Sequence, residues 1–315
     1  MKDFVSVSKL TKKYGELCAV DNLSFTVREG EIFGFLGPNG AGKSTTLNVL
    51  TTLSEFNSGE VSIGGYDLVR QKDKIKGLIG MVPQSIAVYP TLTAAENVTF
   101  FASLYGLSGK KLHSAVDEAL DFVGISDHRK IQARRLSGGM QRRLNIACGI
   151  VHTPKLIVMD EPTVGVDAQS REQILHSINI LRDRGATVIY TSHYMPEVQE
   201  ICDRIAIVDK GRLVACGTEQ ELVTLVTDIS SVYVGIRFPS DFQQEALKKR
   251  LLVIPDVRAV TIRESEIRLD VSLGFSNISP VLKVCMEMGL SILSVNSESP
   301  NLETTFLALT GHDLH

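Results

Sequence analysis

The sequence has few cysteines, no excess of charge of one sign and no long apolar run. Its scattered cysteines form no C-x-x-C pair, which gives no indication of a disulfide framework or a zinc site; they are Cys18, Cys148, Cys202, Cys216 and Cys285. The formal net charge of −3 gives no support for nucleic-acid binding, which favours a basic surface. No run of about 18 apolar residues occurs and the N-terminus shows no apolar signal region, so we expect that the chain does not span a membrane.

A glycine-rich stretch carries the strongest motif in the chain. Residues 37–44 read Gly-Pro-Asn-Gly-Ala-Gly-Lys-Ser, the G-x-x-x-x-G-K-S pattern of a phosphate-binding loop. The apolar run 31–36 before it favours a buried strand, and residues 46–50 after it continue as a helix. An ordinary glycine-rich turn before a helix is the alternative, but it does not explain the full spacing between these two flanks.

This strand–loop–helix context suits a nucleotide. Glycine amides can surround a phosphate, and the N-terminus of the helix adds positive potential. Lys43 is predicted to reach the β- and γ-phosphates, and the Ser44 hydroxyl to hold Mg²⁺. The predicted nucleotide-binding residues here are Gly37, Pro38, Asn39, Gly40, Ala41, Gly42, Lys43, Ser44, Thr45 and Thr46.

A second motif lies far downstream, at the end of another apolar run. Residues 156–159 favour a buried strand, and Asp160 and Glu161 follow directly. Ligands of open α/β sheets bind at the carboxyl ends of parallel strands. Asp160 is therefore predicted to hold Mg²⁺, and Glu161 to act as the general base on an attacking water. A strand that merely ends in surface acids is the alternative, which the phosphate-binding loop disfavours.

A third motif decides the class. Residues 136–141 read Leu-Ser-Gly-Gly-Met-Gln and precede a helical stretch, 142–147. Ser137 and the two glycines form a plausible N-terminal cap, which makes this helix a second candidate anion site. With these motifs in this order, the sequence resembles the ATP-binding subunits of ABC transporters over most of residues 4–220.

The resemblance implies how ATP is bound. In that family two subunits meet head to tail and enclose ATP between the phosphate loop of one and the signature of the other, here Ser137, Gly138 and Gly139. It further implies an adenine-stacking Tyr14, a Gln84 that senses Mg²⁺ and the attacking water, Asp167 at the dimer seam, and His193 on the γ-phosphate. The residues predicted to act in catalysis are Lys43, Gln84, Glu161 and His193, and those predicted to bind metal are Ser44, Gln84 and Asp160.

A lone Tyr, Gln or His would more often be structural, but their order and spacing behind two strong motifs favour function. Two motifs depart from the family pattern. Met140 replaces the usual glutamine of the signature, with Gln141 following, and residues 164–167 read Val-Gly-Val-Asp instead of Ser-Gly-Leu-Asp. Neither change removes a charged or phosphate-contacting group, so we expect an effect on packing across the dimer and not on hydrolysis.

Hydrophobic patterning predicts the architecture of the first part. Antiparallel strands are expected at 4–7 and 23–27 and further strands at 61–63 and 78–82. Helices are expected at 93–105 and 110–124, before the signature helix. Strands at 156–159, 187–190 and 204–208, with a helix at 168–184, predict a parallel sheet with crossover connections. We predict an ABC nucleotide-binding domain over residues 1–225, with a helical subdomain at 88–150.

Four large side chains recur at helical spacing within that subdomain: Phe100, Phe101, Leu104 and Tyr105. We expect them to belong to the core. The alternative is that some of them line the cleft which, in the family, receives a short cytoplasmic helix of the membrane subunit.

The remaining residues show a different pattern, which predicts a module at 230–315. Strands at 232–238, 258–263, 266–272 and 291–296 and helices at 241–252 and 276–288 give the βαββαβ order of a ferredoxin-like fold. Residues 221–315 carry 8 Lys+Arg and 12 Asp+Glu, a poor match to nucleic acid. A last helix, 301–309, places Leu302, Phe306 and Leu309 on one face. We expect this face to pack on its own domain, docking on a partner being the alternative.

The closing residues 301–311 resemble the ending of the drug-resistance branch of ABC ATPases, which includes the daunorubicin-exporter type that works with an ABC-2-type permease. The predicted fold class is α/β, a P-loop NTPase of ABC type with a parallel core sheet, an antiparallel β subdomain and a helical subdomain, followed by a C-terminal α+β ferredoxin-like module.

The predicted function is that of an ATPase subunit that uses ATP and Mg²⁺ to energise a separate membrane permease, for export of a drug-like or lipidic molecule. We expect a head-to-tail homodimer that lies on the cytoplasmic face of the membrane and does not bind nucleic acid. An ABC-type ATPase that remodels nucleic acid or ribosomes is the alternative. That class tends to carry tandem nucleotide domains, coiled coils or zinc inserts, whereas this chain has a single phosphate loop. A P-loop kinase would leave the signature unexplained.

Overall fold

The computed structural model describes residues 2–226, 229–238, 242, 244–263, 265–298 and 301–311. The chain divides into two compact units, of which the second is Gln220–Ala308 and the first takes the residues before it and those from Leu309 on. Three residues at the limits of predicted segments lie outside the described residues: Met1, Asp241 and His315.

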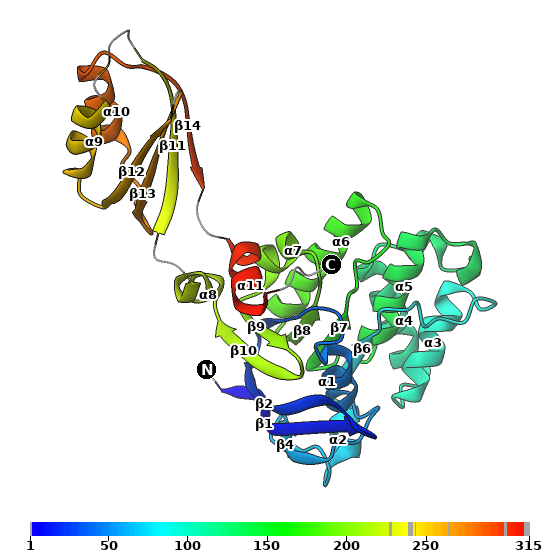
Figure 1. Cartoon of the computed structure of the whole chain (residues 1–315). Coiled ribbons are helices and arrows are strands. Elements are labelled where there is room, and N and C mark those ends of the chain that lie inside the picture. The colour runs from blue at the N-terminus through cyan, green and yellow to red at the C-terminus, as the bar shows by residue number, and fades with distance from the viewer. Residues whose placement is uncertain are drawn as a thin grey trace. The chain divides into compact units, whose positions relative to one another are not determined.

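A six-stranded sheet forms the centre of the first unit (Figure 1), with strand order β10-β9-β3-β8-β7-β6. Its strands are β3 (Ile32–Leu36), β6 (Ile79–Val82), β7 (Leu156–Asp160), β8 (Thr187–Thr191), β9 (Arg204–Asp209) and β10 (Arg212–Gly217). All neighbours are parallel except β10, which pairs antiparallel with β9. β3 and β8 are runs of buried residues, as parallel strands covered on both faces require.

Helices connect the parallel strands, as the alternating pattern predicts. α6 (Ala168–Asp183) connects β7 to β8 and α7 (Met195–Ile201) connects β8 to β9, whereas α1 (Lys43–Leu50) follows β3 and leads to the second sheet. In register, Val188 of β8 lies between Ile32 of β3 and Ile157 of β7. The carboxyl ends of these strands therefore lie at the same edge of the sheet.

A second sheet, antiparallel as predicted, packs against the first. Its order is β2-β1-β4-β5, and its strands are β1 (Asp3–Tyr14), β2 (Leu17–Arg28), β4 (Ser58–Ile63) and β5 (Tyr66–Asp67), followed by the short helix α2 (Lys72–Lys76). Phe25 of β2 stacks on Phe33 of β3 with ring centroids 5.7 Å apart, and its ring centroid lies 5.3 Å from that of Phe35. These aromatic contacts join the two sheets in one core.

The helical segment consists of α3 (Ala94–Leu104), α4 (Gly109–Phe122) and α5 (Gly138–Ile150), with 3₁₀ turns at Ser126–His128 and Ala133–Arg135. Figure 1 shows these helices together at one side of the first unit. α3 begins with a capping box, in which Thr93 and Glu96 each accept a hydrogen bond from the other's backbone amide.

Of the four large side chains at 100–105 that we expect in the core, three are exposed, so the expectation is wrong for them. They are Phe100, Leu104 and Tyr105. The helix instead buries Ala94, Val98 and Ala102, which follow each other at intervals of four residues and form its inner face. These three large side chains therefore contribute to the surface of the helical segment.

The second unit has the βαββαβ order that the sequence predicts. Its elements are β11 (Ile229–Arg237), α9 (Gln244–Leu252), β12 (Val257–Arg263), β13 (Glu266–Ser272), α10 (Ser279–Glu287) and β14 (Ser291–Glu298). The sheet is antiparallel, in the order β12-β13-β11-β14. Both helices lie on the same side of the sheet (Figure 1) and bury Leu247, Leu251 and Val281.

Two helices flank this sheet along the chain, α8 (Glu219–Val226) and α11 (Leu302–Thr310). On α11, Leu302 and Phe306 are buried, whereas Leu309 is only partly buried. Other residues of the same chain cover these two side chains, and that the face packs on its own domain stays a prediction.

We propose that the second unit folds as a domain of its own, and Leu269→Ala tests this. Leu269 is fully buried in the core of that unit, and removing such a side chain costs about 2–5 kcal/mol. Hydrogen exchange along a urea series should show protection lost at lower urea in β11–β14, with the strands of the first unit unchanged.

The matched control is Leu293→Ala, since Leu293 lies on β14 of the same sheet but is exposed. Loss of protection in both units at the same urea concentration would contradict an independent domain.

Candidate nucleotide-binding and hydrolysis site

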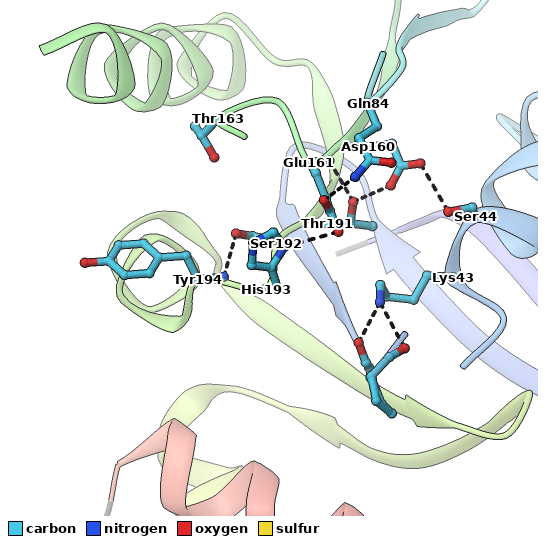
Figure 2. Close-up of polar contacts among 12 residues, drawn as sticks. Lys43, Ser44, Gln84, Asp160, Glu161, Thr163, Thr191, Ser192, His193 and Tyr194 are labelled. Carbon is cyan, nitrogen blue, oxygen red and sulfur yellow. Dashed lines mark hydrogen bonds and ion pairs between the residues drawn. The ribbon is translucent and has the colours of Figure 1, made fainter. Parts of the chain in front are cut away.

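Four adjacent strands of the parallel sheet deliver polar groups to one edge. β3 leads into the phosphate-binding loop, β8 leads to His193, β7 ends at Asp160 and leads to Glu161, and β6 leads to Gln84. The carboxyl ends of these strands meet because the strands are parallel neighbours. Figure 2 shows the cluster that results.

The phosphate-binding loop requires glycine at both ends. A Cβ on Gly37 would lie 2.3 Å from the carbonyl oxygen of Val208, and one on Gly42 would lie 2.4 Å from that of Ala19. Gly42 also has a φ of +94°, which residues with a side chain rarely adopt. As the N-cap of α1 it offers no capping side chain, which leaves the first amides of the helix suited to an anion.

Lys43 is buried at the start of α1 and is turned toward the loop (Figure 2). Its Nζ donates hydrogen bonds to the carbonyl oxygens of Gly37, at 2.6 Å, and Pro38, at 3.2 Å. Burial lowers the pKa of the Lys43 ammonium, and the carboxylates of Glu161 and Asp160 oppose that shift. The Lys43 ammonium therefore lies where it can donate to phosphate oxygens in place of these two carbonyl oxygens.

Asp160 lies between two hydroxyl groups. Ser44 Oγ donates to Oδ2 at 3.3 Å, and Thr191 Oγ1 donates to Oδ1 at 2.7 Å. A hydroxyl and a carboxylate are the oxygen ligands that Mg²⁺ prefers. The pair Ser44 and Asp160 therefore fits the metal role that the sequence predicts for both residues.

Glu161 is the centre of the cluster (Figure 2). Gln84 Nε2 donates to its Oε2 at 2.6 Å, and His193 Nδ1 lies 3.3 Å from its Oε1. The side chain is almost fully buried. Both carboxylate oxygens are thus contacted by residues that the sequence predicts for this site.

The backbone of Glu161 is in an unusual conformation, with a φ of +46°. For a residue other than glycine this costs on the order of 1–3 kcal/mol and is found mainly where the surroundings impose it. Here the amide of Glu161 donates to Thr191, to Oγ1 at 2.9 Å and to the carbonyl oxygen at 3.2 Å. The strand β8 therefore fixes the direction in which the Glu161 side chain leaves the sheet.

The signature residues lie at the start of α5. Ser137 is the N-cap, and its Oγ accepts a hydrogen bond from the amide of Met140 at 3.3 Å. Asp167 caps the neighbouring helix α6 by accepting from the amide of Ser170. The two helix starts are in close contact, because a Cβ on Gly139 would lie 2.3 Å from Ser170 Oγ.

The structure thus brings the predicted site residues together in two groups. The first group contains Lys43, Ser44, Gln84, Asp160, Glu161 and His193. The second contains the signature and Asp167, and within the described residues no hydrogen bond or ion pair joins it to the first. Tyr14 belongs to neither; it is exposed at the end of β1, with Lys12 Nζ 4.6 Å from its ring centroid.

Sequence reasoning missed two residues that support this site. Thr191, described above, could have been found as the polar residue at the end of the strand before His193. Arg142 is buried on α5 and donates to the carbonyl oxygens of Pro83, at 3.0 Å, and Gln84, at 2.6 Å. Burial lowers the pKa of the Arg142 guanidinium, and the nearby Glu161 carboxylate opposes this shift. Nothing in the sequence distinguishes it from Arg143 beside it.

Gly42→Ala should weaken ATP binding about tenfold or more, since a clash and backbone strain of about 1.4 kcal/mol suffice for a tenfold loss. Titration with a fluorescent ATP analogue measures this. Gly65→Ala is the matched control, because Gly65 has a φ of +83° but no atom within 4 Å of the new Cβ. An unchanged Kd for Gly42→Ala would contradict the role of this loop.

Comparison with known proteins identifies the family. Residues 20–164 match the ABC transporter family model. The linearmycin resistance ATP-binding protein of Bacillus subtilis is 40% identical over 315 residues, which cover 98% of this chain and 99% of that protein. The daunorubicin/doxorubicin resistance ATP-binding protein of Streptomyces peucetius is 36% identical over 311 residues, covering 98% and 92%.

Solved structures agree with this assignment. An ATP-binding subunit of an ABC transporter matches with a TM-score of 0.65 and 27% identity, over 70% of this chain and 92% of that one. A dimeric ATP-binding cassette in a post-hydrolysis state with ADP and Pi matches with a TM-score of 0.62 and 28% identity, over 68% of this chain and 98% of that one. The predicted fold class and the predicted resemblance to the drug-resistance branch are confirmed, and the chain belongs to the ABC transporter family, as an ATP-binding protein of the kind that hydrolyses ATP.

Proposed function

We propose that this chain energises the export of a drug-like or lipidic molecule, by hydrolysing ATP for a separate ABC-2-type permease. The observation that carries the ATPase part is the Glu161 carboxylate, contacted by Gln84 and His193 and close to the charge of Lys43. Support for export comes from the two resistance proteins above, which match nearly the whole chain and are named for linearmycin and for daunorubicin and doxorubicin.

ATP with Mg²⁺ fits the first group of residues. Gly37 and Gly42 let the loop pack against the carbonyl oxygens of Val208 and Ala19, and Ser44 and Asp160 present oxygen ligands 3.3 Å apart. Bound Mg²⁺ would offset the charge of the β- and γ-phosphates. We assign the metal to Ser44, Asp160 and the neighbouring Gln84, and adenine to the exposed ring of Tyr14.

Each side chain then has a defined task in hydrolysis. Lys43 Nζ donates to phosphate oxygens instead of to the carbonyl oxygens of the loop. Glu161 accepts a proton from the attacking water. Gln84 and His193 keep the Glu161 carboxylate in place by their contacts with its two oxygens. Catalysis of this kind depends mainly on positioning and on electrostatic stabilisation of the γ-phosphoryl group.

Glu161→Gln should bind ATP normally but hydrolyse it at least about a hundredfold more slowly, the usual contribution of a general base. The amide keeps the shape of the side chain but cannot accept the proton. Phosphate release under saturating ATP measures kcat, and titration of a fluorescent analogue measures binding. Glu172→Gln, an exposed change on α6, is the control, and normal turnover in Glu161→Gln would refute the proposed base.

The division of the site into two groups supports a dimer. Signature residues Ser137, Gly138 and Gly139 cap α5 away from the Lys43 group, so that one chain supplies two separate phosphate-binding elements. We propose that two copies associate head to tail, with the signature of each on the ATP of the other. ATP then joins the subunits, and the charge created by hydrolysis separates them.

A surface groove of the first unit suits a membrane partner. It has a volume of about 630 Å³, and its lining includes Met81, Pro83, Phe101, Leu104 and Tyr105. Of the exposed side chains named above, Leu104 and Tyr105 line it and Phe100 does not. The described part of the chain contains no helix both long and apolar enough to cross a membrane. We propose that this groove receives a helix of the permease and places the chain at the inner face of the membrane.

The groove also borders the hydrolysis site. Pro83, which lines it, is bonded through its carbonyl oxygen to Arg142, and the next residue is Gln84, which contacts Glu161. A helix seated in the groove would therefore press on the segment that positions the general base.

Leu104→Glu should abolish copurification of a multispanning membrane protein from detergent-solubilised native membranes, since a carboxylate would be buried in the apolar groove. The trap is the Glu161→Gln background with ATP. Val69→Glu, at an equally exposed apolar side chain outside the groove, should leave copurification intact.

Copurification that survives Leu104→Glu would contradict docking in the groove. Capture of ribosomes or DNA by the trapped dimer, with no membrane protein, would refute the export proposal and favour the nucleic-acid alternative, while the ATPase assignment would stand.

A further inference from the structure

A buried carboxylate behind the hydrolysis site has no role in the mechanism above. Glu197 lies in the first turn of α7 and is 2% exposed. Its Oε2 accepts three hydroxyl hydrogen bonds, from Tyr190 at 2.6 Å, Thr163 at 2.8 Å and Ser192 at 3.0 Å. Its Oε1 forms an ion pair with Arg171 Nε at 3.1 Å. One side chain therefore links four different segments of the first unit.

Two of these partners adjoin the proposed catalytic residues. Thr163 lies two positions after Glu161, and Ser192 lies directly before His193. Figure 2 shows Thr163 on the segment that leads away from Glu161, and Ser192 beside His193. Glu197 thus joins the two backbone segments whose side chains meet at 3.3 Å. Burial, together with the Glu197 carboxylate, raises the pKa of Tyr190 well above its usual value, which keeps that hydroxyl a donor.

The Glu161 segment needs such a constraint. Its positive φ is strained, and the hydrogen bonds from the Glu161 amide to Thr191 fix only the start of the turn. The bond from Thr163 to Glu197 fixes the residues after it. Since a displacement of the reacting groups by about 1 Å can cost a hundredfold in rate, the anchoring of both segments to one carboxylate has a direct effect on hydrolysis.

From these contacts we infer that Glu197 is a positioning residue for ATP hydrolysis, which sets the Glu161 carboxylate against His193. The inference rests on the proposed roles of those two residues. Loss of the Glu197 carboxylate removes the hydrogen bonds that hold the segments of Thr163 and Ser192. The Glu161 and His193 side chains then lose their alignment, while the phosphate-binding loop is unaffected.

The same carboxylate connects the site to the signature. Arg171, its ion-pair partner, follows Ser170 on α6, and Ser170 is the residue packed against Gly139. The guanidinium of Arg171 also lies 4.9 Å from the ring centroid of Tyr194, the residue after His193. A shift of the signature helix α5 would therefore move α6. Through Arg171, that movement would displace Glu161 and His193 together.

A purely structural carboxylate would behave differently, and the chain offers one for comparison. Glu31 is 5% exposed and pairs with Arg204 at 3.1 Å, but it lies before the amino end of β3, at the opposite edge of the sheet from the site. Glu31→Gln should lower stability without a change in hydrolysis once the protein is folded.

The test compares Glu197→Gln with Glu31→Gln in steady-state ATP hydrolysis, at a temperature where circular dichroism shows both folded. We expect kcat of Glu197→Gln to fall about tenfold or more with KM for ATP within about twofold, because misalignment of the reacting groups leaves ground-state binding intact. Equal kcat in the two variants would overturn the inference.

Single hydroxyl changes cover the case in which Glu197→Gln does not fold. Thr163→Val removes the hydrogen bond to Glu197 and should lower kcat. Thr163→Ser keeps the hydroxyl and should have the kcat of the unchanged protein. Normal kcat in the double variant Thr163→Val, Ser192→Ala would overturn the inference.

Glu161→Gln, measured in parallel, separates the two proposals. If it hydrolyses ATP normally, the proposed base is wrong. If it is inactive while Glu197→Gln has the kcat of Glu31→Gln, only the positioning role is wrong.

Discussion

The arrangement of this site depends on the order of four strands. β3, β8, β7 and β6 are consecutive in the sheet and parallel, so that the phosphate-binding loop, His193, Glu161 and Gln84 start from adjacent carboxyl ends. The aromatic contacts of Phe25 with β3 pack the antiparallel sheet against this layer. Neighbouring strands lie about 4.8 Å apart, so a strand inserted between any two of these would move their groups apart by about that distance again.

Buried charge and a strained backbone residue meet at that edge. Lys43 and Glu161 are both buried, and Glu161 has a left-handed backbone. The surroundings compensate with hydrogen bonds to Thr191, Gln84 and the loop carbonyls. Strain and buried charge persist in proteins where the surroundings over-determine them, and the contacts of Glu197 extend that support to the segments behind the site. The Glu161 carboxylate is therefore placed before any substrate arrives.

The two units relate differently to known proteins. The solved cassettes compared above match about 70% of this chain, whereas the resistance proteins match 98% of it, with most of their own length covered. The resistance proteins therefore share more of this chain than the solved cassettes do. This pattern accords with the resemblance of residues 301–311 to the drug-resistance branch.

Sequence alone determined the phosphate-binding loop, the Asp160–Glu161 pair, the capping role of Ser137 and the βαββαβ order of the second unit, because each depends on residue types at short, fixed spacing. Only the tertiary structure decided which face of α3 is buried, and it exposed Phe100, Leu104 and Tyr105 against expectation. It alone revealed Glu197 and Arg142. Their partners come from distant positions of the chain, and the burial of a charged side chain depends on which hydroxyls, carbonyls or counter-charges the fold brings around it.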